Sequence, residues 1–122
     1  MAKFASNEVL DAALAVVAGA NRMLLLAGQP ASYAAAVAGA LAETTMAPAD
    51  FTLAAGSGGA RQIGVAARAG LVARAAGTAD HVALVDGVGQ RLLYVTSCPA
   101  QPLTAGNGVT VASWQVSIGA PL

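Results

Sequence analysis

The sequence predicts an α+β or mainly β fold, with an N-terminal helix beside an antiparallel β-sandwich or barrel-like domain. Three observations carry this prediction. Apolar residues recur at helical spacing near the N-terminus, over about residues 6–18. From residue 51 to 118, turn residues arrive at intervals of roughly eight to fifteen, between short segments rich in Val, Ile, Leu and Thr. The length of 122 residues fits one domain, so we assign 1–122 to a single β-rich unit.

The helix over 6–18 has signals at both ends. Ser6 is a suitable N-cap, and Glu8 and Asp11 place negative charge in the first turns, where the helix dipole favours it. The apolar residues form one stripe, and Gly19 is a suitable end.

Two further elements are expected before residue 51. Residues 22–27, of which 23–27 are all apolar, lie between polar and turn residues, and this pattern predicts a short buried strand. Ser32 is a suitable cap for a second helical segment that ends near Leu41. We expect the β-branched pair at 44–45, together with Pro48, to terminate it.

Between residues 51 and 95 the pattern predicts strands and hairpins. Gly-rich residues 56–59 suit a hairpin connection, and residues 82–85 suit a strand covered on both faces. Residues 86–89 then turn the chain into a strand at 92–95. Over 62–74 an extended chain would separate two sets of side chains. One face would carry Ile63, Val65, Ala67, Ala69 and Leu71, and the other Gln62, Arg68 and Arg74.

The last strand has an irregular pattern. Val109 and Val111 are at odd-numbered positions, whereas Trp114, Val116 and Ile118 are at even-numbered ones, so a regular strand would place the two sets on opposite faces. A β-bulge near 112–113, or a bend where the strand changes sheets, would bury both sets. We expect Trp114 to anchor the core, with a hydrogen-bond partner for its indole N–H.

Composition narrows the classes of function. Hydrophobic residues make up 57% of the chain and charged residues 10%, against roughly 25% in ordinary domains, so much of the surface must be apolar. Six basic and six acidic residues are scattered singly, which argues against nucleic acid as a partner. The apolar run at 23–27 is too short to span a membrane, and polar residues interrupt the N-terminal region where a signal peptide would be apolar.

No catalytic, cofactor-binding or metal-binding residues are predicted. We interpret His81, the only histidine, as lying at a strand start and bonded to a backbone group. Ser97 and Cys98 are its nearest candidate nucleophiles, but neither lies in a nucleophile turn, and Cys98 suits core filling. Residues 56–61 lack the Lys-Ser/Thr end of a phosphate loop.

Four segments carry a resemblance to a known group of proteins: 6–14 (SNEVLDAAL), 77–86 (GTADHVALVD), 92–98 (LLYVTSC) and 103–118 (LTAGNGVTVASWQVSI). In order and spacing they resemble small virion structural proteins of tailed bacteriophages. The resemblance implies a capsid decoration or cement protein, made in the host cytoplasm and located in the virion. Its partners would be the major capsid protein and copies of itself in a homo-oligomer.

Two alternatives remain open: a structural protein of the tail or head–tail junction, and a carbohydrate-binding module that attaches particles to a host surface. For a cement protein, the candidate interface residues are Arg61, Arg68, Arg74 and Arg91, whose guanidinium groups can bond carboxylates at an interface rim. Solvated surface charge is the alternative interpretation for each of them.

Overall fold

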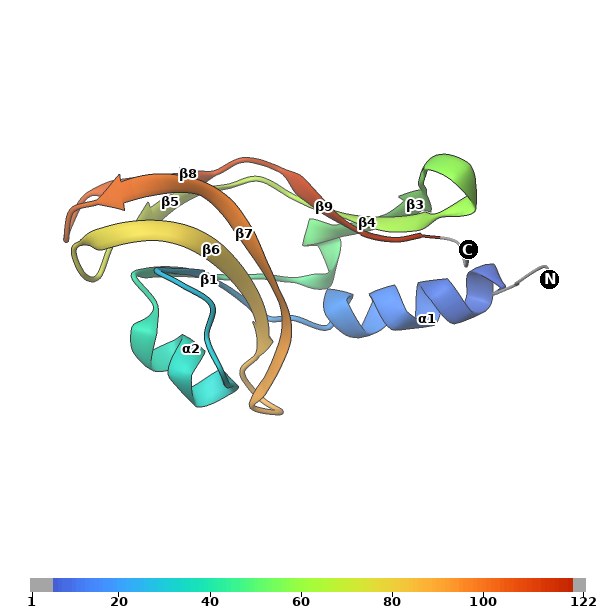
Figure 1. Cartoon of the computed structure of the whole chain (residues 1–122), viewed down its shortest axis with the longest axis horizontal. Coiled ribbons are helices and arrows are strands. Elements are labelled where there is room, and N and C mark those ends of the chain that lie inside the picture. The colour runs from blue at the N-terminus through green and yellow to red at the C-terminus, as the bar shows by residue number, and fades with distance from the viewer. Residues whose placement is uncertain (1–5, 120–122) are drawn as a thin grey trace.

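The computed structural model describes residues 6–119 and shows a mostly antiparallel β fold with two α-helices (Figure 1). This confirms the predicted fold class. The helices are α1 (Asn7–Ala18) and α2 (Tyr33–Gly39), with short 3-10 turns η1 (Pro48–Asp50) and η2 (Ser57–Gly59). The strands are β1 (Arg22–Leu26), β2 (Ala42–Thr45), β3 (Phe51–Ala55), β4 (Arg61–Val65), β5 (Arg68–Val72), β6 (Gly77–Asp86), β7 (Arg91–Leu103), β8 (Gly108–Val111) and β9 (Trp114–Ile118).

The strands form three antiparallel sheets. A four-stranded sheet has the order β2-β1-β6-β7, a three-stranded sheet the order β3-β4-β9, and β5 and β8 form a two-stranded ribbon. β6 lies inside the largest sheet and is buried on both faces. Val82 and Leu84 belong to one core cluster, whereas Ala83 and Val85 pack on the other face with Ala36 of α2. The prediction of a doubly covered strand at 82–85 is therefore confirmed.

Helix α1 covers the three-stranded sheet (Figure 1). The Ser6 hydroxyl accepts a hydrogen bond from the Val9 N–H at 3.3 Å, and Gly19 is the C-cap, as predicted. Leu10 and Leu14 are buried, and Leu14 packs in one cluster with Ile63 of β4 and Val116 of β9. The apolar stripe thus fixes α1 to this sheet.

The segment after β1 differs in part from the prediction. Ser32 caps α2 by accepting from the Ala35 N–H at 3.1 Å, but the helix ends at Gly39. Thr44 and Thr45 do not terminate a helix; they lie in β2, opposite Met23 and Arg22 of β1. Their β-branched side chains favour extended backbone, and pairing with β1 supplies the partner that a strand needs.

The prediction of one continuous face over 62–74 is wrong. β4 belongs to the three-stranded sheet and β5 to the ribbon, so the chain changes sheets between them. Ile63 and Val65 are buried, but Ala67 and Ala69 are exposed. Gly70 has a φ of 80°, at the irregularity in the pairing of β5 with β8.

The C-terminal segment confirms the expected change of sheet. β8 pairs with β5 and β9 pairs with β4, with Ala112 and Ser113 between them. Trp114 is half-buried and stacks on Tyr94 with ring centroids 6.1 Å apart. Its packing against two core clusters agrees with an anchoring role. The expected partner of its indole N–H is missing, because Nε1 is buried without an acceptor among the described residues.

Candidate interaction surface

The four-stranded sheet and the β5–β8 ribbon enclose the larger core, and one side of this enclosure is open. On the closed side β2 lies against β5, and the Arg74 N–H donates to the Leu41 carbonyl at 2.7 Å. On the other side, residues 104–107 connect β7 directly to β8, but these two strands do not pair with each other. β7 pairs with β6, and β8 pairs with β5. We call the gap between β7 and β8 the open seam.

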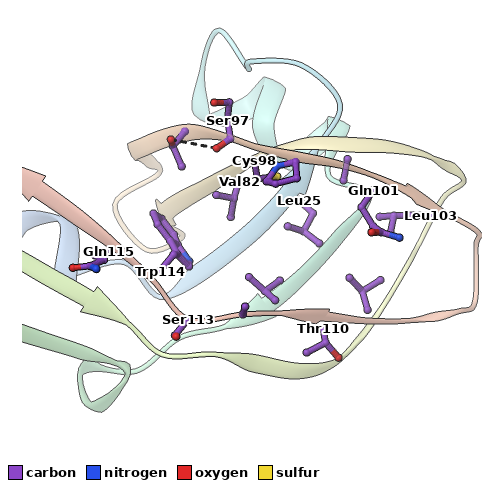
Figure 2. A pocket seen from close by; sticks show the side chains of 16 residues that line it. Leu25, Val82, Ser97, Cys98, Gln101, Leu103, Thr110, Ser113, Trp114 and Gln115 are labelled. Carbon is purple, nitrogen blue, oxygen red and sulfur yellow. Dashed lines mark hydrogen bonds between the residues drawn. The ribbon is translucent and has the colours of Figure 1, made fainter.

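A pocket of about 620 Å³ lies at the open seam (Figure 2). Leu25 and Val82 come from the inner face of the four-stranded sheet, and Trp114 stands at one end. The remaining lining comes from Ala79 and from residues 96–99, 101, 103, 109–113 and 115. This seam pocket is mainly apolar, and none of its lining residues carries a formal charge. The Gln101 amide adds polar character to the lining, whereas the hydroxyls of Ser97 and Thr110 point away from the pocket (Figure 2).

The four candidate interface arginines lie apart, and each has a carboxylate of the same chain as its partner. Arg61 Nε is 2.8 Å from an oxygen of Asp11, and Arg68 Nη1 is 3.4 Å from one of Asp50. Arg91 Nη2 is 3.1 Å from an oxygen of Asp86.

The Glu43 carboxylate forms ion pairs with two arginines, Arg74 and Arg22. Arg74 Nη1 lies 3.5 Å and Arg22 Nη1 3.8 Å from its carboxylate oxygens. Arg74 also donates to the carbonyls of Val37 and Ala40 at 3.3 Å. All five arginines of the described residues are therefore paired within the chain, which leaves no excess of positive charge on this part of the surface.

Apolar side chains are exposed on several elements. The large ones are Val9 and Val16 of α1, Leu53 of β3, Val72 of β5 and Val88 of the β6–β7 turn. Val88 is 89% exposed. Strands at sheet edges add unpaired backbone groups, because β3 and β9 flank the three-stranded sheet and β2 and β7 the four-stranded one. The available contact chemistry is thus apolar packing and backbone hydrogen bonding.

His81 lies inside β6 rather than at a strand start, and its partner is a carboxylate. Its Nδ1 is 2.7 Å from Oδ1 of Asp80, so the prediction of a backbone partner is wrong. The Gly28 N–H donates to the same oxygen at 2.7 Å, and this bond, followed by the one to His81, lowers the pKa of Asp80. Ser97 stands opposite His81 on β7, but no hydrogen bond joins their side chains.

Cys98 is a half-buried free cysteine. Burial, followed by the charge of Asp80, raises its pKa. Within residues 6–119, no three side chains of the His, Cys, Asp and Glu types are grouped to hold a metal ion. Neither of the two helices in that range is long and apolar enough to cross a membrane.

Comparison with known proteins gives no match: no protein-family model matches the chain, and neither do the curated proteins or the solved structures. Sequence reasoning named the four candidate arginines, which the structure places apart, and it did not predict the seam pocket. The one signal pointing to it is the change of parity at 112–113, which marks where the chain leaves the ribbon for another sheet.

Proposed function

We propose that the chain is a non-enzymatic structural protein of a tailed-phage virion, which decorates the capsid by binding the major capsid protein shell and copies of itself. The observation that carries this proposal is the internal pairing of all five described arginines. With these charges neutralised, apolar side chains and strand edges remain for contact. The resemblance of four segments to small phage virion proteins supports the same role.

The size of the surface suits repeated contacts. The chain exposes 6669 Å², and an interface of standard size takes about 800 Å² from each partner. Three such contacts would cover about a third of the surface. An apolar surface that promotes self-association of a free monomer then becomes a source of binding free energy in a lattice.

The first test is the copy number of the chain in purified phage particles, relative to the major shell protein. A ratio near one, or a simple fraction of it, supports decoration across the shell. A handful of copies would place the chain at the tail or head–tail junction and contradict decoration. Complete absence from particles would refute the virion role.

A second test compares particles with and without the chain. Decoration predicts that particles lacking it lose their genome at a lower temperature and in low salt. Equal resistance of both particles would refute cementing even if the copy number were high.

The carbohydrate-binding alternative has weaker support. Such modules stack sugar rings on exposed aromatic side chains, but the four aromatic side chains within residues 6–119, Tyr33, Phe51, Tyr94 and Trp114, are all half-buried. Tyr94 and Trp114 also stack on each other. A glycan array would decide the matter, since saturable binding to one glycan class would favour attachment over decoration.

A further inference from the structure

We propose that the open seam takes up an extended, uncharged segment of another protein chain. The segment would pair with the free edge of β7 and insert alternate side chains into the seam pocket. This inference rests on the proposed function in one respect, namely that the chain works by binding other proteins. It adds the place and the mode of that binding.

The backbone of β7 provides the first argument. β7 pairs with β6 along one edge, while its other edge has no strand partner in the described chain. Pro99 and Pro102 have no N–H and cannot donate from that edge, so pairing is confined to the residues before Pro99. Residues 96–98 are in this stretch and also line the seam pocket. An added strand would therefore lie along the mouth of the pocket.

The pocket provides the second argument. In strand addition, main-chain hydrogen bonds give affinity, and pockets for alternate side chains give specificity. Side chains on one face of a strand recur at about 7 Å, which is the spacing of two same-face positions along residues 96–98, the lining residues that precede Pro99. A volume of about 620 Å³ is within the range of ligand sites. The seam pocket can thus receive more than one side chain of a single segment.

The chemistry of the lining defines the occupant. Leu25, Val82 and Leu103 offer apolar contact, and no lining residue could neutralise a buried charge. The inserted side chains must therefore be apolar and uncharged. All nine strands of the described residues already pair within the three sheets, so none of them is left to fill the open seam. For this reason we assign the segment to another chain.

The test uses a defined probe and the natural reporter of the pocket. The probe is an acetylated and amidated peptide of roughly seven residues, alternating threonine and valine so that one face is apolar. Trp114 is the only tryptophan of the chain and lines the pocket, so its fluorescence reports occupancy. We expect a saturable change, together with slower amide hydrogen exchange in residues 96–98. A peptide of the same sequence, N-methylated on the groups facing β7, should bind at least about ten-fold more weakly.

Two matched variants separate the pocket from the rest of the surface. Ala112→Phe places an aromatic ring at an exposed lining position, whereas Ala38→Phe places the same ring on exposed α2, outside the pocket. We expect Ala112→Phe to weaken peptide binding about ten-fold and Ala38→Phe to leave it unchanged. The N-methylated peptide tests the proposal on the unaltered protein, should Ala112→Phe fold poorly.

The outcomes distinguish this inference from the proposed function. No peptide binding, or equal binding of the N-methylated peptide, overturns strand addition at the seam. If the chain is nevertheless abundant in particles, decoration stands without it. Conversely, specific peptide binding by a chain that is absent from particles supports the seam and refutes the virion role.

Discussion

Replacing Leu14 with alanine tests whether α1 is bound to the three-stranded sheet as the structure shows. Leu14 is 0% exposed and packs with Ile63 and Val116. Leucine-to-alanine changes at such sites cost about 3–5 kcal/mol, and half-buried neighbours such as Val17 and Ile118 allow some relaxation, so we expect about 3 kcal/mol. For 122 residues, an unfolding entropy of about 2.1 cal/mol/K per residue converts this to a Tm lower by about 12 °C.

The measurement is a thermal melt followed by far-UV circular dichroism, with urea unfolding as an independent estimate of the free energy. Val9→Ala is the matched control, since Val9 lies on the same helix but is 61% exposed. Its effect should stay within about 0.5 kcal/mol, which corresponds to about 2 °C. A Leu14→Ala variant that melts within this margin of the wild type would refute the docking of α1.

Three further predictions concern the hairpin, the thiol and a bend. A hydrogen bond from the Gly89 N–H, and secondly one from Arg91, lowers the pKa of Asp86, so the ionised carboxylate stabilises the fold above about pH 4 and this stabilisation is lost on further acidification. Asp86→Ala should therefore have a lower free energy of unfolding than the wild type at pH 7. A difference in free energy of unfolding that does not shrink between pH 7 and pH 2 would contradict this. Cys98 should react with iodoacetamide at pH 8 more slowly than in the urea-unfolded chain, because its pKa is raised; equal rates would exclude this. Gly70 has a φ of 80°, so Gly70→Ala should lower the free energy of unfolding in urea by about 1 kcal/mol. Gly39 lies in helix α2 without a positive φ, so the control variant Gly39→Ala should not lower it.

The elements predicted correctly are those whose signals are local or depend on burial alone. Ser6 and Gly19 mark the two ends of α1, and the uninterrupted apolar run at 82–85 indicates a strand covered on both faces. These features do not require knowledge of which strand pairs with which. They can therefore be predicted from a single sequence.

The errors arise where pairing decides the structure. Alternation continues from Ile63 to Leu71 through the point where the chain changes sheets, and alanine at 67 and 69 fits either an exposed or a buried position. Thr44 and Thr45 become a strand only because β1 lies beside them. The seam pocket combines residues from β1, β6, β7 and the 109–115 segment, so no local pattern predicts it.

The cluster of Leu14, Ile63 and Val116 also affects the order in which the protein can fold. Of the described elements, α1 leaves the ribosome first and β9 last, yet both belong to this cluster. Contacts between residues so distant in sequence form late and slow the overall reaction. During synthesis, α1 and the β3–β4 hairpin must wait with part of their apolar surface uncovered until β9 arrives. Until β9 emerges, this uncovered apolar surface is open to aggregation.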